Sequence, residues 1–261
     1  EMNPGFGGVH PEPIAAYLRP LAGAIGAGMG FYGVATDGDA DRIGAMDEHG
    51  NFIDPHKIMA LALKHLVEKR GMTGTVVRTV STTRMIDRLA QKYNLPLRET
   101  PVGFNHISDY MMKENVLIGG EESGGISFSG HIPEGDGILM GLLLIEMVAS
   151  AKTSLFEMVQ ELQKEVGPVF YERTDLRLKH PVEKRAMVEK LEKDHPAEIG
   201  GEKIVEVSKM DGVKYIFADD SWLLIRPSGT EPVLRVYAEG RSEEMVKALM
   251  HFGETIAAGI T

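Results

Sequence analysis

The sequence predicts an α/β protein built on mixed sheets, followed by a C-terminal α+β domain with an antiparallel sheet flanked by helices. Two observations lead to this prediction. Between residues 75 and 118, strand-like and helix-like patterns alternate as β-α-β-α-β, which implies parallel strand pairs. After Gly167-Pro168, short strand-like runs follow one another with few helices between them, which favours an antiparallel sheet.

The first part of the chain should be irregular before it enters a small group of strands. Residues 3–13 are rich in glycine and proline, and a helix is expected at 14–21. Strands are expected at 31–36, 43–46 and 52–53.

Asp54 and Pro55 then supply an N-cap and a first-turn proline for a helix that Gly71 ends. Strands follow at 75–80, 97–100 and 116–118, and helices at 83–93, 107–114 and 138–150. The helix at 138–150 is apolar nearly all round, so we expect it to be buried. Ser154 and Glu157 form a capping box for the next helix, which should end before Gly167.

The C-terminal part should contain strands at 169–173, 204–209, 213–217, 222–225 and 233–238, with helices at 182–194 and 243–258. We therefore expect three domains, at 1–71, 72–167 and 168–261.

Composition narrows the possible functions of these 261 residues. A formal net charge of −10 argues against general nucleic-acid binding, which needs a basic face. No apolar run reaches the roughly 18 residues of a membrane span, so no membrane partner is expected. The absence of cysteine agrees with a reducing compartment and a cytoplasmic location. The chain begins Glu1-Met2-Asn3-Pro4, without an initiator methionine, and reads as part of a longer protein.

Asp37, Asp39 and Asp41 alternate with small residues and are followed by Arg42. A curled loop would bring the three carboxylates together, and oxygen-only ligands of this kind suit Mg²⁺. Arg42 could then grip a phosphate oxygen that also contacts the metal. An EF-hand is rejected because its sixth position needs glycine and here is Arg42. A solvated acidic turn between two strands remains the alternative.

Three further loops carry candidate ligands. Residues 120–125 combine carboxylates and a hydroxyl on glycine-rich backbone, and strand-like alternation would put Glu121 and Ser123 on one side, facing two neighbouring sugar hydroxyls. Residues 226–232 offer a guanidinium, hydroxyls and glycine between prolines, the components of an anion site to which Arg235 could add a charge. His131 could contact phosphate or donate a proton. Ordinary solvated turns are the alternatives for all three.

Together these loops resemble the α-D-phosphohexomutase family, the phosphoglucomutases and phosphomannomutases. The resemblance runs through nearly the whole chain. It covers the Gly-Gly-Val-His-Pro-Glu-Pro segment at 7–13, Asp-Gly-Asp-Ala-Asp-Arg at 37–42, Gly-Glu-Glu-Ser-Gly-Gly at 120–125 and Arg-Pro-Ser-Gly-Thr-Glu-Pro at 226–232. It implies part of the family's second domain at 1–71, which binds metal, then its third at 72–167, which binds sugar, and its last at 168–261, which binds phosphate.

The resemblance implies Mg²⁺-dependent transfer of a phosphoryl group between a phosphoserine and a hexose phosphate, through a hexose 1,6-bisphosphate. Asp37, Asp39 and Asp41 would bind Mg²⁺, and Arg42 the reacting phosphoryl group. The residues expected to bind substrate are Gly103, Asn105, Glu121, Ser123, Arg226, Ser228, Gly229, Thr230 and Arg235. The Glu-Glu-Ser-Gly-Gly sequence is most similar to a phosphoglucomutase, which converts glucose 1-phosphate to glucose 6-phosphate.

This chain departs from the family pattern at several places. The phosphoserine loop, typically Thr-Ala-Ser-His-Asn-Pro, is absent together with the N-terminal domain that carries it, so this chain alone should be inactive. Relatives commonly have lysine at the positions of Asn105 and Gly135; Arg78 could compensate and is a third catalytic candidate beside Arg42 and His131. A non-catalytic sugar-phosphate-binding protein is the alternative function, and a metal-dependent phosphatase is a third. The loops do not distinguish glucose, mannose and glucosamine.

Overall fold

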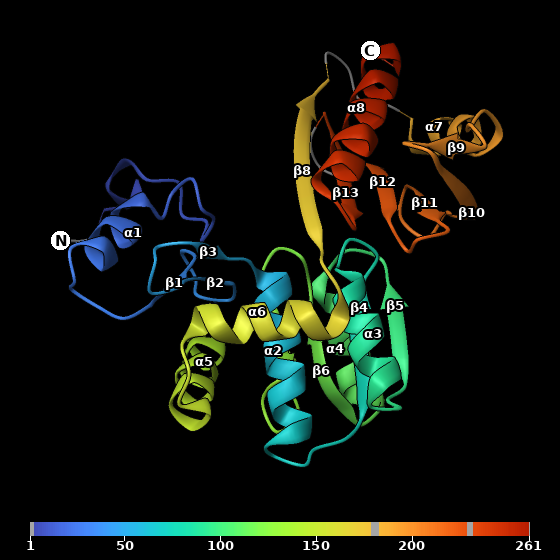
Figure 1. Cartoon of the computed structure of the whole chain (residues 1–261). Helices are drawn as coiled ribbons and strands as arrows, with labels where there is room; N and C mark the ends of the chain where they lie inside the picture. Colours follow the sequence, from blue (N-terminus) through green and yellow to red (C-terminus); the bar gives the residue numbers. More distant parts are fainter. Residues whose placement is uncertain (1–2, 179–182, 229–231, 261) are drawn as a thin grey trace. The chain divides into compact units, whose positions relative to one another are not determined.

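A computed structural model describes residues 3–178, 183–228 and 232–260 (Figure 1). The chain forms two compact units, Glu1–Val166 and Gly167–Thr261.

The first unit is built on a four-stranded sheet with the order β5-β4-β6-β7. Its strands are β4 (Thr75–Thr79), β5 (Leu97–Thr100), β6 (Val116–Gly120) and β7 (Ile126–Phe128). β4 pairs in parallel with β5 and β6, whereas β7 is antiparallel to β6. The mixed sheet expected from the sequence is therefore present, with β7 as a strand that the sequence did not reveal.

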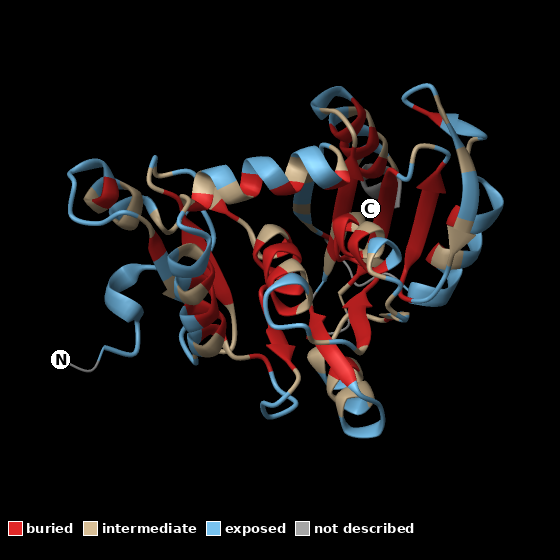
Figure 2. Ribbon diagram, turned by 60° about the horizontal axis from the view of Figure 1, so that its bottom comes forward, coloured by how far each residue is buried: buried red, intermediate tan, exposed pale blue. Residues whose placement is uncertain are grey.

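Helices cover this sheet. They are α2 (Pro55–Glu68), α3 (Arg84–Lys92), α4 (Phe104–Lys113), α5 (Gly137–Ala151) and α6 (Leu155–Val166). Asp54 caps α2 by accepting a hydrogen bond from the Lys57 N–H at 3.0 Å, and Thr83 caps α3 in the same way. α4 packs on β4 and β6, while α2 packs on β6 and against α3, α5 and α6. Figure 2 shows the resulting buried layer running through the strands.

A second, three-stranded sheet in this unit has the order β1-β2-β3 and is antiparallel. Its strands are β1 (Gly33–Thr36), β2 (Ile43–Met46) and β3 (Phe52–Ile53), and α1 (Arg19–Gly26) contacts β1. The helix expected at 14–21 is displaced to Arg19–Gly26, because proline is tolerated in the first turn of a helix, where Pro20 lies, but disrupts a helix interior.

The expectation that α5 is buried all round is wrong. Its inner face packs on β1, β2, β7 and α2, but Ile138, Leu142 and Ile145 are 61%, 59% and 43% exposed. These residues recur at helical spacing and form one exposed apolar stripe.

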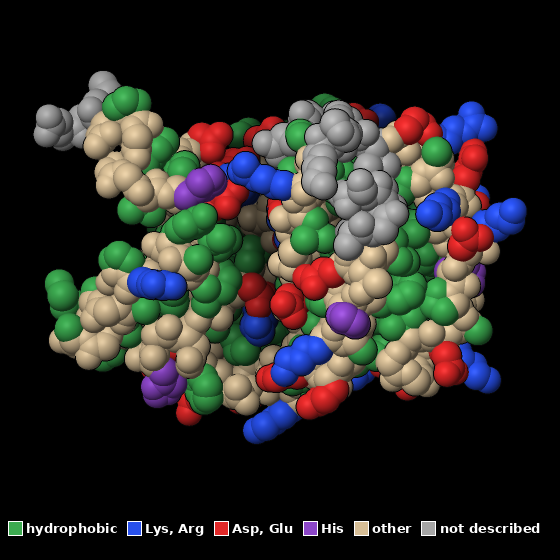
Figure 3. Space-filling view, turned by 90° about the horizontal axis from the view of Figure 1, so that it is seen from above, with side chains coloured by type: hydrophobic (Ala, Val, Ile, Leu, Met, Phe, Trp, Pro, Cys, Tyr) green, Lys and Arg blue, Asp and Glu red, His purple; other side chains and the backbone are tan. Residues whose placement is uncertain are grey.

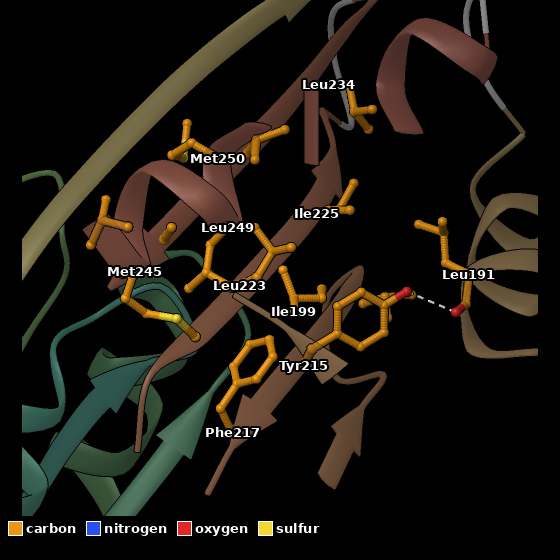
Figure 4. Close-up of a cluster of buried hydrophobic side chains, with 14 of the residues drawn as sticks. Leu191, Ile199, Tyr215, Phe217, Leu223, Ile225, Leu234, Met245, Leu249 and Met250 are labelled. Carbon is orange, nitrogen blue, oxygen red and sulfur yellow. Dashed lines mark hydrogen bonds between the residues drawn. The ribbon is translucent and has the colours of Figure 1, made fainter. Parts of the chain in front are cut away.

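The second unit contains a six-stranded antiparallel sheet with the order β8-β13-β12-β11-β10-β9. The strands are β8 (Phe170–Arg177), β9 (Glu198–Ile199), β10 (Glu202–Ser208), β11 (Val213–Phe217), β12 (Trp222–Pro227) and β13 (Val233–Gly240). With α7 (Lys184–Lys193) and α8 (Glu243–Ile260), this is the α+β architecture predicted for the C-terminal part. Side chains from both helices and one face of the sheet form the core shown in Figure 4, where the Tyr215 hydroxyl donates to the Leu191 carbonyl at 2.7 Å.

On the face shown in Figure 3, Lys and Arg side chains are interspersed with Asp and Glu side chains. Within the described ranges, no single helix is long and apolar enough to cross a membrane; α5 and α6 meet that test only as a pair bent by 86°.

Candidate functional site

The acidic loop, residues 37–42, connects β1 to β2. Carboxylate oxygens of Asp37, Asp39 and Asp41 lie within 4.8 Å of one another. The chain curls here because Ala40 adopts a left-handed backbone conformation, with φ of 64°. In a straight strand, alternate side chains would stand about 6.6 Å apart. The curl therefore gathers the three carboxylates.

Arg42 is held against these carboxylates. Its Nε donates to Asp37 Oδ2 at 2.6 Å, and its backbone N–H donates to Asp37 Oδ1 at 3.2 Å. Burial opposes ionisation of Asp37, but its hydrogen bonds outweigh burial and lower the pKa of Asp37. Burial, followed by the hydrogen bond and charge of Asp37, raises the pKa of Asp41 to about 6. The two carboxyl groups thus differ strongly in proton affinity.

The chemistry of the acidic loop fits a hard divalent cation. The three carboxylates lie together, and the Arg42 guanidinium contacts those of Asp37 and Asp41, so the loop carries an excess of negative charge. Asp41 Oδ1 is buried and accepts no hydrogen bond from the part of the chain that the structure describes. Asp39 is exposed and free to turn toward a ligand. Oxygen donors in this number suit Mg²⁺, which also retains water or phosphate ligands; binding of Mg²⁺ here stays a prediction.

Two loops distant in sequence are bonded to the acidic loop. Arg42 forms an antiparallel bridge with Gly125, and the Ile43 N–H donates to the Gly124 carbonyl at 3.2 Å. The Gly137 N–H, at the start of α5, donates to the Ala40 carbonyl at 2.9 Å. The backbone therefore joins residues 37–42, 120–125 and 131–137 into one site.

At two positions, the backbone segments of this junction lie too close together to accommodate a side chain. A Cβ on Gly137 would lie 2.3 Å from the Arg42 carbonyl oxygen, and one on Gly135 would lie 2.8 Å from the Asp41 carbonyl oxygen. A larger residue at Gly135, such as the lysine expected in relatives, requires a different path of this loop. The small residues here thus fix how closely α5 approaches the acidic loop.

Residues 120–125 form a turn rather than a continued strand, which corrects the alternation argument for Glu121 and Ser123. The Gly124 N–H donates to the Glu121 carbonyl at 3.2 Å, and the Glu121 N–H donates to the Gly125 carbonyl at 2.9 Å. The Glu121 side chain reaches across to accept the Gly103 N–H at 2.8 Å. Glu121 and Gly103 are thus brought together, while Asn105 is exposed in the first turn of α4 and Ser123 is half-buried in the turn.

His131 lies in the loop before α5 and is oriented by Asp136. Its Nε2 is 2.8 Å from Asp136 Oδ2, while Asp136 Oδ1 accepts the Leu139 N–H at 2.8 Å. One carboxylate therefore caps α5 and holds the imidazole. The role of Asp136 was not predicted from the sequence, although an Asp directly before a helix is a recognisable N-cap signal.

Arg78 has a different environment from the other catalytic candidates. Its guanidinium is buried, donates two hydrogen bonds to Asp87 at 2.6 and 2.7 Å, and donates another to Glu99 at 2.5 Å. These contacts tie β4 to α3 and β5. They fit a structural ion pair, and no contact supports the catalytic role, which stays a prediction.

The second unit holds the other candidate residues. Arg226 on β12 and Arg235 on β13 are direct cross-strand partners. Arg226 Nε donates to Asp211 Oδ2 at 2.5 Å, and Arg235 Nε lies 3.3 Å from Asp175 Oδ2. We call these four residues the arginine row. The role of Asp211 was not predicted from the sequence, because Asp211 precedes Arg226 by 15 residues and no local pattern links them.

The loop after Arg226 is only partly described. The Ser228 N–H donates to the Val233 carbonyl at 2.8 Å and so closes the loop. Gly229 and Thr230 lie outside the described residues. Their predicted role in binding phosphate stays a prediction.

Two family models match this chain. The model for phosphoglucomutase/phosphomannomutase, alpha/beta/alpha domain III, matches residues 54–166. The model for the phosphoglucomutase/phosphomannomutase C-terminal domain matches residues 178–252. The acidic loop lies before both matched ranges.

Individual relatives agree with these models. A phosphoglucomutase/phosphomannomutase of Thermococcus kodakarensis is 32% identical over 94% of this chain and 51% of the relative. A phosphoglucosamine mutase of Bacillus velezensis is 32% identical over 94% of this chain and 49% of the relative. This chain therefore spans about half the length of these curated relatives.

Solved structures share the fold. A crystal structure from Thermus thermophilus, assigned there as a phosphomannomutase, has a TM-score of 0.82 and 34% identity, covering 99% of this chain and 53% of that chain. The N-acetylphosphoglucosamine mutase of Aspergillus fumigatus, solved in complex with GlcNAc-6P and magnesium, has a TM-score of 0.54. At 20% identity, over 87% of this chain and 49% of that chain, it shows likeness of fold alone.

Proposed function

Because this chain belongs to the α-D-phosphohexomutase family, we propose that it serves Mg²⁺-dependent intramolecular phosphoryl transfer on hexose phosphates. It would supply the metal-binding, sugar-binding and phosphate-binding loops of that reaction. The phosphoserine would come from a polypeptide region that this sequence does not include. This chain alone is therefore expected to bind hexose phosphates without interconverting them.

The observation that carries this proposal is the bonding of the acidic loop to residues 120–125 through the pairing of Arg42 and Gly125. This pairing sets the carboxylates of one loop beside the turn that carries Glu121 and Ser123. Phosphoryl transfer depends mainly on positioning and charge neutralisation. A rigid junction between a cation site and a sugar contact supplies both.

We assign separate tasks to the residues of this site. Asp37, Asp39 and Asp41 would hold Mg²⁺, whose charge would neutralise the transferred phosphoryl group. Arg42, fixed by Asp37, would contact that phosphoryl group. Glu121, held in place by its contact with the Gly103 N–H, would accept hydrogen bonds from sugar hydroxyls.

His131 is the candidate for proton transfer. When the serine O–P bond breaks and a P–O bond forms to a sugar hydroxyl, the hydroxyl proton must pass to a base and the departing serine oxygen must take up a proton. The contact with Asp136 supports this role because the carboxylate orients the imidazole. Arg78 is a poorer candidate, since arginine stays charged and its guanidinium is buried.

The sugar is proposed to be glucose, with glucose 1,6-bisphosphate as the intermediate. The Glu-Glu-Ser-Gly-Gly turn motivates this choice, while the relatives named above include both phosphoglucomutase/phosphomannomutase and phosphoglucosamine mutase proteins. These sugars differ at one ring position, so the loops described here carry little discrimination between them.

Calorimetric titration of this chain tests the binding part of the proposal. Glucose 1-phosphate, mannose 1-phosphate and glucosamine 1-phosphate are titrated with and without Mg²⁺. We expect binding of at least glucose 1-phosphate, strengthened by Mg²⁺ and lost when the sugar carries no phosphate. Absence of binding for all three would contradict the proposal.

A mutase is separated from a non-catalytic binding protein by assaying the complete gene product. Formation of glucose 6-phosphate from glucose 1-phosphate, dependent on Mg²⁺ and stimulated by glucose 1,6-bisphosphate, supports the mutase. Tight binding without turnover supports the binding protein. Steady release of inorganic phosphate would instead indicate a phosphatase.

A further inference from the structure

The arginine row places two like charges side by side on one sheet. Arg226 and Arg235 are direct cross-strand partners on β12 and β13, and Asp175 on β8 is the partner of Arg235. Like charges directly opposite one another destabilise a sheet. The repulsion between the two arginines therefore destabilises the sheet, and the neighbouring Asp211 and Asp175 carboxylates offset it.

Both arginines lie on the face of the sheet opposite the core. Their chain neighbours Ile225 and Leu234 are fully buried in the core cluster (Figure 4). Because successive side chains of a strand point to opposite faces, Arg226 and Arg235 point to the other face. The core therefore sets the side of the sheet on which the guanidinium groups lie, but not their orientation.

Asp211 fixes that orientation for Arg226. Asp211 is 6% exposed; its Oδ2 accepts Arg226 Nε at 2.5 Å and its Oδ1 accepts Lys184 Nζ at 2.7 Å. Burial opposes ionisation of Asp211, but Lys184 and Arg226 outweigh it and lower its pKa. Binding the guanidinium by its Nε edge defines the plane of the group and the direction of its terminal nitrogens.

The backbone brings Asp211 to this position. The next residue, Gly212, has φ of 92°, and a Cβ there would lie 2.4 Å from the Ile225 carbonyl oxygen and 2.9 Å from Arg226 Cα. The turn between β10 and β11 is therefore pressed against β12 at Arg226. This close approach, which glycine permits, holds the carboxylate in place independently of any ligand.

Asp175 offers a matched comparison. It is 40% exposed, lies 3.3 Å from Arg235, and is also bound by Arg173 Nε at 2.8 Å. Its contact with Arg235 is longer and more exposed than the contact between Asp211 and Arg226. Asp175 should therefore orient Arg235 less strictly than Asp211 orients Arg226.

We propose that Asp211 is a positioning residue, which holds the Arg226 guanidinium ready for the non-reacting phosphate of a hexose phosphate. This inference rests on the proposed function, in which Arg226 binds that phosphate. Positioning and simple electrostatics make opposite predictions. Removing a negative charge near a phosphate site should tighten binding if only charge matters. If Asp211 positions Arg226, the same change should weaken binding.

The test is calorimetric titration with glucose 1-phosphate of the wild type, Asp211→Asn, Asp175→Asn and Arg226→Ala. We expect Arg226→Ala to bind more than about tenfold more weakly, because it loses the charged contact itself. Asp211→Asn should bind about tenfold more weakly, the worth of one oriented charged hydrogen bond. Asp175→Asn should change affinity by less than about threefold, in line with an exposed ion pair.

A double-mutant cycle separates positioning from a general loss of structure. Adding Asp211→Asn to Arg226→Ala should cost no further affinity, whereas a structural defect would weaken binding in both backgrounds. Asp211→Glu keeps the charge but moves the carboxylate, so it should also weaken binding and serves if Asp211→Asn does not fold. Circular dichroism on each variant confirms the fold.

The outcomes are distinguishable. Unchanged or tighter binding by both Asp211 variants, with binding lost in Arg226→Ala, overturns this inference and leaves the proposed function standing. Equal binding by the wild type and Arg226→Ala refutes the role of Arg226 and, with it, the role of Asp211.

Discussion

The acidic loop and the arginine row both bring like charges together, but the charges in each are balanced differently. Each crowds like charges into a small space: three carboxylates in the loop, two guanidinium groups in the row. In the loop, burial and the neighbouring Asp37 raise the pKa of Asp41 to about 6. In the row, Asp211 and Asp175 both have lowered pKa values, because the cations beside them outweigh burial.

This difference indicates in which region a bound ligand would reduce the repulsion between like charges. The acidic loop contains an ionisable group whose charged form is disfavoured, so a bound cation would improve its energy. The arginine row already contains carboxylates that offset its repulsion, so a bound anion finds oriented donors. The acidic loop therefore attracts a cation but destabilises the fold while no cation is bound. The guanidinium groups of the arginine row are already held by carboxylates before an anion binds.

The largest effect should follow from removing a ligand of the acidic loop. Asp39→Ala is expected to weaken Mg²⁺ binding by more than about 100-fold, since outer-shell partners of metals alone account for about 10–100-fold. Asp39 is exposed, so the fold should tolerate the change. Calorimetry with Mg²⁺ gives the measurement.

Glu189→Ala is the matched control for Asp39→Ala. It removes the same charge from an exposed position on α7 and should leave Mg²⁺ affinity unchanged. Equal Mg²⁺ binding by Asp39→Ala and the wild type would remove the metal assignment and the contrast drawn above.

The next effect tests whether the junction between α5 and the acidic loop is rigid. Gly137→Ala should lower the free energy of unfolding by about 1–3 kcal/mol, the usual cost of overpacking. It should also weaken Mg²⁺ binding, because the new Cβ displaces the Arg42 carbonyl. Gly141→Ala on the same helix is the control, since its Cβ would meet Val34 at an ordinary 3.7 Å. Similar urea unfolding curves for both variants would show that the junction is flexible enough to accommodate the added Cβ.

Acid should weaken the acidic loop's affinity for Mg²⁺. With the pKa of Asp41 at about 6, its carboxyl group is mostly protonated at pH 5 and ionised at pH 7. A protonated ligand must lose its proton to bind a metal, so Mg²⁺ affinity should fall about tenfold from pH 7 to pH 5. Titrations at four pH values test this. A constant affinity across the range would show that the Asp41 carboxylate is not a ligand.

Local sequence signals predicted much of the first unit. Asp54 with Pro55, and Thr83, start helices where a cap accepts a nearby backbone N–H, so the sequence contains the whole interaction. The start of α1 was predicted wrongly although a local signal was present, since Pro20 marks the first turn of a helix. The three-residue strand β7 is too short to show a periodic pattern.

The site was predictable only as far as its parts are local. The acidic loop is continuous in sequence, and its carboxylates gather as expected. The turn at Glu121 and the orientation of His131 by Asp136 depend on backbone geometry that composition does not define. Asp211 and Arg226 meet because the loop between β10 and β11 is pressed against β12, and the exposed stripe on α5 depends on which face the neighbouring elements cover.

The smallest effect gives the most direct contrast between the two regions. Asp41 has a folded-state pKa of about 6, above the ordinary value of 3.8, so its contribution to stability is present below pH 3.8 and lost as pH rises through 6. At pH 7, Asp41→Asn should stabilise the metal-free protein by less than about 1 kcal/mol, because the Asp41 side chain is 46% exposed and partly screened. Asp211→Asn should destabilise it, since the lowered pKa of Asp211 means that stability is present above its unfolded value and lost only in acid. Thermal unfolding of both variants at pH 7 without Mg²⁺ decides the matter. Stability changes of the same sign in both variants would mean that the charges of Asp41 and Asp211 affect the fold in the same way. The raised pKa of Asp41 would then not reflect a site prepared for a cation.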